Sequence, residues 1–484
     1  MPATAPRDLT AAGLLRVIGA GLAALLVLSL ITAPRSSAAT ASPSPSPSAT
    51  PSPSPVVVNP TNPATPGNFT GYGFDQCNAP SQSAMDTWLA TSPYLAAGIY
   101  ISGNSRACKT QSNLTPTWVA TQLAHGWHLL PITLGPQASC STRFPRYGPK
   151  IDPVISAAKT NGAYATAIAQ GTTEADRTLA AAAALGLVPG STMFYDLEAY
   201  DTSKVACRES ALSFLSAWTV EIKKHGYLSG VYSSAGSGLK ALDQARMSPS
   251  SASAYVFPDQ IWIADWNGQA NTGSSYLSAY GWASHQRVHQ YQGGHNETYG
   301  GVTINIDRNF LDVGLGSVAV AETHCRSIPV DLAGYPTIAP PASGTVVDPA
   351  LKPYVKALKC LLRERSGLKG RTNPRFTPLL AHAVAAWSGA HGRNATATKW
   401  TKRMWLTLFA TNTHPLLKYG SVGAGVRDLQ RALLVTSQRP KPAITGVFDR
   451  ATETALTAYQ QKRKIRPLGI ATASTWAALA AGRR

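Results

Sequence analysis

The run Met193-Phe194-Tyr195-Asp196-Leu197-Glu198 is a short apolar stretch that ends on two carboxylates. Three further runs end in the same way: Gly73-Phe74-Asp75, Ile261-Trp262-Ile263-Ala264-Asp265 and Ile304-Asn305-Ile306-Asp307. A strand that ends on Asp or Glu delivers its carboxylate to the C-terminal rim of the sheet, where α/β-barrel enzymes hold their active sites. A single Asp fits a helix N-cap or a loop equally well. Four of them at strand ends favour an acidic site, and we therefore begin from a hydrolase hypothesis.

The pair Asp196 and Glu198 is the sharpest of these signals. Side chains alternate along a strand, so both carboxylates point to the same face of the sheet. Two ionised carboxylates this close repel each other, and one of them is thereby prepared to act as a general acid.

Strand-like and helical segments alternate around these runs. The helical patterns cover 84–89, 116–125, 173–185 and 207–224, and the eight strand-like runs are 71–75, 97–101, 128–132, 192–197, 229–233, 260–265, 287–291 and 302–307. Eight strands that alternate with helices predict an α/β protein with a (β/α)₈, TIM-like barrel, which we place at residues 68–316. The last two links are too short for full helices, so we expect an irregular barrel on that side.

The N-terminal residues read as an export signal followed by a spacer. Arg7 and Arg16 precede an apolar stretch from Val17 to Ala33, and small residues follow it. We assign residues 1–39 to a signal peptide, with an uncleaved membrane anchor as the alternative. Residues 40–67 are rich in Ser and Pro and predict an extended linker.

Exported proteins use cysteines in disulfides, and this chain has six cysteines. The sequence does not fix their pairing; sequence neighbourhood favours Cys77 with Cys108, Cys140 with Cys207, and Cys325 with Cys360. No spacing suits structural zinc, and we expect no metal. The formal net charge of +19 suits polyanions outside the cell, whereas no nucleic-acid recognition motif is present.

Beyond a linker at 317–350, the chain repeats itself with a period of about seventy-one residues. Val355-x-x-Leu358-x-x-x-Leu362 corresponds to Val426-x-x-Leu429-x-x-x-Leu433, and Phe376, Trp387 and Trp405 correspond to Phe448, Tyr459 and Trp476. Helical spacing within each unit predicts two small three-helix modules, at 351–413 and 414–482.

The second module resembles the peptidoglycan-binding-like helical domain. The resemblance rests on Val426–Leu433, Ile444-Thr445-Gly446-Val447-Phe448-Asp449, Tyr459-Gln460, Gly469 and Thr475-Trp476. We expect its Phe, Leu and Trp residues to form the core rather than contact ligand. The first module has Asn373-Pro374-Arg375-Phe376-Thr377 in place of the Gly-x-Phe-Asp run and is interpreted as a degenerate copy.

The barrel also resembles known families. Its motifs follow the order found in family 25 glycoside hydrolases, the lysozyme-like muramidases, and match more closely their relative, the glycoside-hydrolase-like domain of unknown function, family 1906. The matching motifs are Gly73-Phe74-Asp75, Tyr195–Glu198, Gly230-Val231-Tyr232-Ser233, Trp262–Trp266, His289-Gln290-Tyr291 and Ile306-Asp307-x-Asn309.

The resemblance implies a role for each acidic residue. Glu198 would be the general acid, and Asp196 would orient the 2-acetamido group of the substrate or stabilise charge at the anomeric carbon. Asp75 and Asp307 would line the floor of the cleft, and Asp265 would lie on the opposing rim. Substrate assistance by an N-acetyl group is our preferred version of the two-carboxylate scheme.

Aromatic and amide side chains near these acids fit a sugar cleft. Only about half of the aromatic residues can face the mouth, because strand side chains alternate, and we expect Trp262 to pack in the wall. Gln290 is either a donor to a sugar hydroxyl or a strand-end cap. The predicted substrate-binding residues are Tyr195, Tyr232, Trp266, Gln290, Tyr291 and Asn309.

The sequence thus predicts a secreted, wall-associated glycosidase that cleaves a β-linked amino-sugar polymer, with peptidoglycan the first substrate hypothesis. The alternatives are a non-catalytic protein that binds envelope glycan in the same cleft, and a hydrolase of another envelope polysaccharide. We expect no cofactor, no nucleic-acid partner, no stable membrane insertion after signal cleavage, and a monomer.

Overall fold

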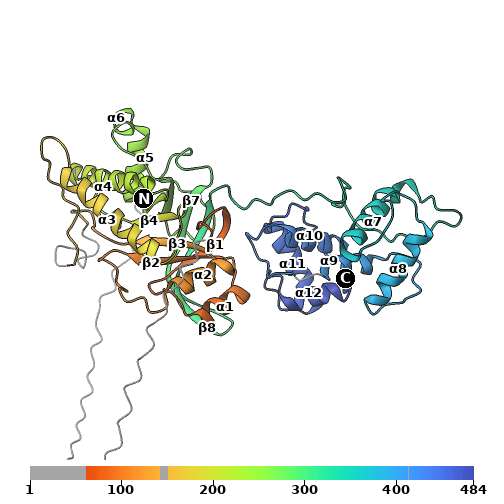
Figure 1. Cartoon of the computed structure of the whole chain (residues 1–484). Coiled ribbons are helices and arrows are strands. Elements are labelled where there is room, and N and C mark those ends of the chain that lie inside the picture. The colour runs from red at the N-terminus through yellow and green to blue at the C-terminus, as the bar shows by residue number, and fades with distance from the viewer. Residues whose placement is uncertain (1–61, 142–150, 412–413) are drawn as a thin grey trace, which may run out of the picture. The chain divides into compact units, whose positions relative to one another are not determined.

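The structure is a computed structural model of the 484-residue chain, and it describes residues 62–141, 151–411 and 414–484 (Figure 1). The predicted signal peptide and most of the predicted Ser/Pro linker lie outside the described residues. Within the described ranges, no helix combines the length and the apolar content that crossing a membrane requires.

The first part of the described chain is a closed barrel of eight strands in the order β1 to β8, as predicted. The strands lie within two residues of their predicted starts. They are β1 (Phe69–Asp75), β2 (Ala96–Ser102), β3 (His128–Thr133), β4 (Thr192–Asp196), β5 (Leu228–Ser234), β6 (Gln260–Ala264), β7 (Gln286–Tyr299) and β8 (Val302–Val313).

Helices connect the first six strands. The crossovers contain α1 (Gln82–Thr91), α2 (Pro116–Ala124), α3 (Ala165–Ala184), α4 (Val205–Lys224), the π-helical turn η1 (Ala235–Leu239), α5 (Lys240–Met247) and α6 (Pro249–Ala252). Thr115 caps α2 because its side chain accepts a hydrogen bond from the Trp118 amide, and Pro116 occupies the first turn, where a missing N–H costs nothing. Figure 1 shows α3 and α4 running side by side against the sheet.

One strand departs from a regular (β/α)₈ barrel. Adjacent strands in the series from β1 to β7 are parallel, but β8 is antiparallel to both of its neighbours, β7 and β1. A two-residue turn, Gly300-Gly301, joins β7 to β8, and both glycines have positive φ, 58° and 83°. Positive φ at both central residues is what a type I′ hairpin requires. The irregular side expected from the short links is therefore a β-hairpin that closes the barrel.

Two apolar layers hold the barrel. Its interior contains a small cluster around Phe194, Trp262 and Leu311, while a larger cluster, which includes Trp88, Trp218 and Ile222, lies between the strands and the outer helices. Trp262 is 1% exposed, which confirms that it packs within the barrel. Because the interior below the mouth is filled with side chains, a ligand has access only at the rim.

The C-terminal part is all-helical, as the repeat predicts. The first module contains α7 (Lys352–Ser366), preceded by the short η2 (Pro349–Leu351), then α8 (Pro378–Ala390) and α9 (Lys402–Ala410). The second contains α10 (Ala424–Val435), α11 (Arg450–Arg463) and α12 (Ala473–Ala480). The repeated aromatic residues are buried, which agrees with their assignment to the core: Phe376, Trp387, Trp405, Phe448, Tyr459 and Trp476.

Both modules share one continuous core, and the segment expected to be a linker contributes to it. Val330, Tyr335, Ile338 and Val347 are all less than 5% exposed and belong to that core. The second half of the 317–350 segment is thus packed structure.

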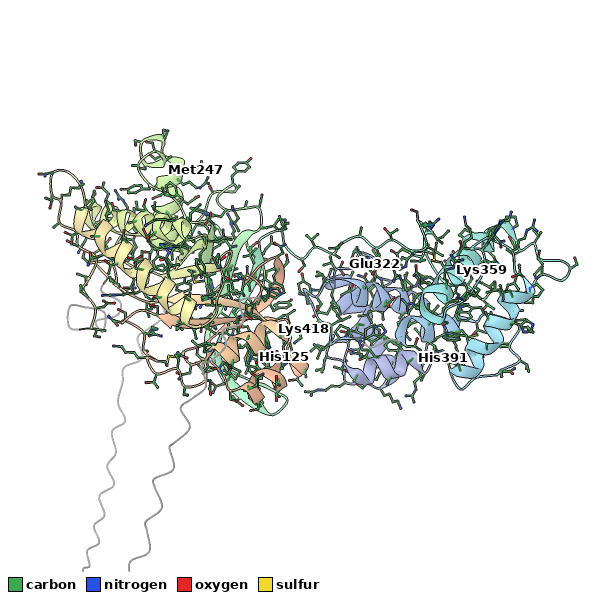
Figure 2. All side chains as sticks on the ribbon, viewed as in Figure 1. His125, Met247, Glu322, Lys359, His391 and Lys418 are labelled. Atoms are coloured by element: carbon green, nitrogen blue, oxygen red, sulfur yellow. A yellow bond between two sulfur atoms is a disulfide. The ribbon has the colours of Figure 1, made fainter. Side chains whose placement is uncertain are left out.

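Figure 2 marks His391, which follows α8 and stacks on Trp387 with ring centroids 3.9 Å apart.

All three disulfides that sequence neighbourhood favours are present: Cys77–Cys108, Cys140–Cys207 and Cys325–Cys360. The first two lie in the barrel domain and the third joins the segment before α7 to α7 itself.

Candidate active site

The mouth of the barrel holds two adjoining cavities with volumes of about 560 Å³ and 470 Å³. Both are lined by Tyr100, Glu198 and Asp307, so these side chains stand at the junction of one continuous cleft. Asp75 lines the first cavity, and Asp196 and Asp265 line the second. The structure therefore brings all five predicted acidic residues to the same cleft.

Asp75 and Asp307 face each other across the β1–β8 ladder, where they are directly paired in register. Gln290 Nε2, from β7, donates to Asp75 Oδ1 at 3.1 Å and to Asp307 Oδ2 at 3.2 Å. Asn309 Nδ2 donates to Asp75 Oδ1 at 2.6 Å. One amide group thus bridges the two carboxyl groups and fixes their position on the floor of the cleft.

Burial makes this floor a place where a proton is retained. Burial raises the pKa of Asp307, and the negative charges of Asp75 and Glu198 raise it further. Burial also raises the pKa of Asp75, although hydrogen bonds from Asn309 and Gln290 oppose the increase. Asp307 therefore keeps its proton to a higher pH than Asp75, because two neighbouring carboxyl groups add to the effect of burial.

Asp307→Asn is expected to stabilise the protein at pH 8 by about 1–2 kcal/mol and to leave its stability unchanged near pH 4. The folded protein holds the Asp307 proton to a higher pH than the unfolded chain, for which the ordinary pKa is 3.8. The free energy of unfolding therefore falls as the pH rises from 3.8 to the raised pKa of Asp307 in the folded protein. Replacement by Asn removes that loss of stability. Urea titrations at both pH values measure the effect.

Asp265→Asn is the matched control, because Asp265 is a half-buried aspartate that lines the same cavity. An equal gain at pH 4 and pH 8, or an equal gain in the control, would contradict the assignment of the retained proton to Asp307.

Gln290 is among the residues that line the second cavity, but its side chain is almost completely buried there. It is 1% exposed, and its Oε1 accepts hydrogen bonds from the Tyr232 hydroxyl at 3.0 Å and from Trp266 Nε1 at 2.9 Å. Its Nε2 is engaged with the two aspartates. Both ends of the amide are occupied, so the structure places Gln290 as a brace between the acidic floor and the aromatic wall.

Glu198 is held by its backbone in the loop after β4. Gln137 Oε1 accepts a hydrogen bond from the Glu198 amide at 2.8 Å, and Gln137 Nε2 donates to the Asp196 carbonyl at 2.8 Å. Gln137 is 2% exposed. Since one buried side chain fixes the backbone on both sides of Leu197, the two carboxylates keep a defined separation.

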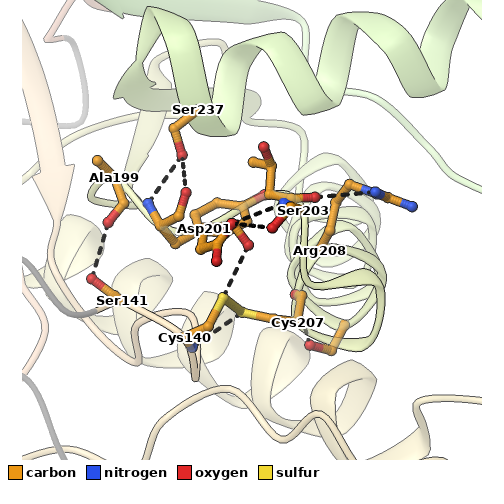
Figure 3. The surroundings of a disulfide bond; sticks show 11 residues. Cys140, Ser141, Ala199, Asp201, Ser203, Cys207, Arg208 and Ser237 are labelled. Atoms are coloured by element: carbon orange, nitrogen blue, oxygen red, sulfur yellow. Dashed lines mark hydrogen bonds between the residues drawn. A yellow bond between two sulfur atoms is a disulfide. The ribbon is translucent and has the colours of Figure 1, made fainter.

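The Cys140–Cys207 disulfide lies next to the residues that follow Glu198 in the same loop (Figure 3). Ser141 Oγ donates to the Ala199 carbonyl at 3.0 Å, and Cys140 Sγ lies 3.3 Å from the Asp201 carbonyl. Ser237 Oγ donates to the Tyr200 carbonyl at 2.7 Å. The loop that carries Glu198 is therefore tied to the loop after β3, to α4 and to η1.

Asp196 is 2% exposed at the end of β4, and the Tyr100 hydroxyl donates to its Oδ2 at 3.3 Å. Burial and the nearby Asp196 raise the pKa of Tyr100, so this phenol stays neutral and keeps its donor hydrogen. Asp265 lies half-buried on the opposing rim, where its Oδ2 accepts a hydrogen bond from Asn267 Nδ2 at 3.2 Å.

The predicted substrate-binding aromatics divide into two groups. Tyr232 and Trp266 line the cleft, and Trp266 is 60% exposed. Tyr195 is fully buried on the outer side of β4, against Phe214 and Trp218, and its hydroxyl donates to the Pro136 carbonyl at 2.5 Å.

Tyr291 and Asn309 are also held away from the cleft. Tyr291 is 7% exposed and its ring lies 6.3 Å from that of His289. Asn309 is fully buried; its Oδ1 accepts from Trp262 Nε1 at 2.8 Å, and its Nδ2 holds Asp75. The structure thus brings Tyr232 and Trp266 to the mouth but not Tyr195, Tyr291 or Asn309.

Comparison with known proteins agrees with this architecture. Residues 86–311 match the sequence profile of the Rv2525c-like, glycoside hydrolase-like domain family, and residues 422–479 match that of the peptidoglycan-binding domain family. The barrel is an Rv2525c-like, glycoside hydrolase-like domain. The second helical module is a peptidoglycan-binding domain. Together with the disulfides, these domains fit an extracellular cell-wall protein whose function concerns wall glycan.

Solved structures that are similar to this chain include the following three. An uncharacterized protein of B. stearothermophilus has 17% identity over 50% of this chain and 97% of its own, with a TM-score of 0.32. The Tat-secreted protein Rv2525c of Mycobacterium tuberculosis, in complex with L-tartrate, has 15% identity over 50% and 95%, with a TM-score of 0.33. The modular autolysin LytC of Streptococcus pneumoniae has 12% identity over 50% and 46%, with a TM-score of 0.30. No curated protein matches the chain.

Sequence reasoning missed several residues of the glycoside hydrolase-like domain that shape its cleft. Tyr100 lies close to the end of β2, as the acids lie at the ends of their own strands, and a search for polar side chains of every kind at strand ends would have found it. Gln137 and Arg106 lie in the loops after β3 and β2 and have no such signal. Arg106 lines the first cavity and donates from Nε to the Gly103 carbonyl at 2.8 Å.

Proposed function

We propose that this protein is a secreted cell-wall glycosidase that cleaves a β-linked amino-sugar polymer, peptidoglycan being the substrate we infer first. The observation that carries the proposal is the convergence of Asp75, Asp196, Glu198 and Asp307 on one cleft at the mouth of a glycoside hydrolase-like barrel. The peptidoglycan-binding domain supports the choice of substrate, because tethering to an insoluble polymer raises its local concentration at the cleft.

In the proposed mechanism, Glu198 donates a proton to the departing glycosidic oxygen. It lines both cavities, so it reaches a chain that lies along the whole cleft. Asp196, held by Tyr100, orients the 2-acetamido group of the sugar or stabilises positive charge at the anomeric carbon. On the acidic floor, Asp75 loses its proton at a lower pH than Asp307, and its carboxylate adds negative charge beneath that carbon, which favours an oxocarbenium-like transition state.

The aromatic side chains of the cleft supply the binding surface for the sugars. Trp266 projects into solvent beside the second cavity, and Tyr232 lies half-buried in its wall. An exposed indole face gives a pyranose ring a flat apolar surface on which to stack. Gln290 orients both aromatic residues through its carbonyl oxygen.

The test is release of new reducing ends from purified peptidoglycan by the chain without residues 1–39, with mass spectrometry of the fragments. Release that increases with enzyme and time supports a glycosidase, and the fragment termini identify the bond that is cleaved. No release, while the protein still sediments with the wall, overturns peptidoglycan as the substrate and supports a glycan-binding protein that uses the same cleft. A panel of other envelope polysaccharides tests the remaining substrate hypothesis.

A further inference from the structure

The first helical module contains a basic cavity that lies outside the glycoside hydrolase-like barrel. Its volume is about 260 Å³, and it lies between α7 and the loop that leads to α8. Four of its lining residues are cationic: Lys359, Arg363, Lys369 and Arg371. No Asp or Glu is among the residues that line it. A cavity with this lining attracts anions.

Lys359 is the residue that makes this cavity unusual, and Figure 2 labels it on α7. It is 5% exposed, and its Nζ donates to Asn373 Oδ1 at 2.8 Å. Over the described residues, neither Lys359 nor the three other cations of the cavity forms a salt bridge. Burial lowers the pKa of Lys359, as expected for an ammonium group that lacks a paired carboxylate.

The second module provides an internal comparison, because the repeat pairs Lys359 with Gln430. Gln430 is fully buried and closes the corresponding space with neutral hydrogen bonds. Its Nε2 donates to the Val447 carbonyl at 2.9 Å, and its Oε1 accepts from the amides of Thr445 and Gly446 at 3.0 Å and 2.9 Å. The first module therefore carries a buried positive charge where its partner module carries a saturated amide.

The loop around the cavity is arranged to present further donors. Arg363, one turn beyond Lys359 on α7, donates to the Gly370 carbonyl and so anchors the loop. Gly370 has a φ of +100°, a conformation that favours glycine, and it turns the chain between Lys369 and Arg371. The side chains of Lys369 and Arg371 are exposed at the cavity. A buried ammonium group and three flanking cations suit a tetrahedral oxyanion that accepts several hydrogen bonds.

We propose that this cavity binds the phosphodiester group of an anionic envelope polymer, of the polyol-phosphate class. The first helical module would then be a second wall anchor with a specificity different from that of the peptidoglycan-binding module. An open, concave cavity of about 260 Å³ accepts one phosphate and its adjacent carbons, whereas a membrane surface is met by a flat cationic face. The high positive charge of the chain, +19, agrees with a polyanionic partner.

The test uses a fluorescently labelled poly(glycerol phosphate) as the probe and the chain without residues 1–39, with binding measured by fluorescence anisotropy. Lys359→Gln, which installs the residue of the second module, and Arg371→Gln are each expected to weaken binding by about tenfold. Lys352→Gln removes the same charge from an exposed position on α7 and is expected to change binding by less than about twofold. Inorganic phosphate is expected to compete with the polymer.

Equal affinities for the three variants would overturn the proposal, since they would indicate binding through net charge alone. If the variants lost affinity for phosphatidylglycerol vesicles but kept their affinity for the polymer, the proposal would be overturned in favour of a lipid headgroup. Thermal unfolding of each variant controls for misfolding. If Lys359→Gln lowers the melting temperature, Arg371→Gln decides the question, because its side chain is exposed.

Discussion

Glu198→Gln is expected to reduce the release of reducing ends from peptidoglycan by about a thousandfold, the middle of the range that general acid catalysis contributes. Glutamine keeps the size of the side chain. Residue 198 donates to the Gln137 side chain through its backbone amide, so the substitution leaves this hydrogen bond and the position of the loop unchanged. What the variant loses is the transferable proton. Initial rates measure the loss, and co-sedimentation with the wall is expected to remain at the wild-type level.

Glu209→Gln is the matched control for this experiment. Glu209 lies on α4, where its carboxylate contacts Lys159 and the Tyr164 hydroxyl, and it lines neither cavity of the cleft. The control is expected to keep its activity within about twofold of the wild type. If Glu198→Gln retained more than about a tenth of the wild-type rate, Glu198 would not be the acid. Asp307, whose pKa is raised by burial, would then be the first candidate to examine.

The strand-end pattern located the acidic site because it depends on local rules. Asp75 and Asp196 are the last residues of β1 and β4, and parallel strands bring such ends to one rim. Asp307 reaches the same rim for a different reason: it lies within β8, which runs antiparallel to β1 and places Asp307 opposite Asp75. The Gly300-Gly301 pair between two strand patterns was the signal for that hairpin.

Side-chain direction explains why two predicted sugar-binding residues do not reach the cleft. Tyr195 neighbours Asp196 on β4, so the alternation that sends Asp196 inward sends Tyr195 outward against α4. Tyr291 follows Gln290 on β7 and is turned from the cleft in the same way. The same rule, applied to each motif in turn, separates these residues from those that face the mouth.

Long-range partners were beyond the reach of sequence patterns. Gln290 and Asn309 were predicted to contact substrate. In the structure, both side chains donate hydrogen bonds to Asp75, which is more than 200 residues away in sequence. Nothing local in His289-Gln290-Tyr291 specifies which residues the amide meets once the barrel closes. The packed residues Val330 and Ile338 were likewise hidden in a segment whose composition is that of a linker.

Gln290→Met is expected to lower the free energy of unfolding at pH 8 by about 3–4 kcal/mol, because it removes a buried network and leaves its partners in place. Methionine preserves the approximate volume of glutamine, so the change is mainly one of hydrogen bonding. The lost contacts join Gln290 to Asp75, Asp307, Tyr232 and Trp266. Urea denaturation measures the loss, and we expect a parallel fall in the rate of glycan cleavage.

The loss of stability is expected to depend on pH. The Gln290 hydrogen bond opposes the rise in the pKa of Asp75, so without it the pKa of Asp75 in the folded protein rises further. A carboxyl group whose pKa is raised by folding costs stability once the pH exceeds its ordinary value of 3.8, and that cost grows until the raised pKa is reached. The destabilisation by Gln290→Met should therefore be smaller at pH 4, where the folded and unfolded carboxyl groups are both largely protonated, than at pH 8.

Gln292→Met supplies the control, since it makes the same replacement two residues further along β7. Gln292 accepts one hydrogen bond, from Arg308 Nη1 at 3.0 Å, and is half-buried. Its replacement is expected to cost about 1 kcal/mol or less, with no difference between pH 4 and pH 8. If Gln290→Met were no more destabilising than this control, the amide would not brace the acidic floor. Its role would then be the one first predicted, contact with a sugar hydroxyl, and the loss would appear in KM for the glycan rather than in stability.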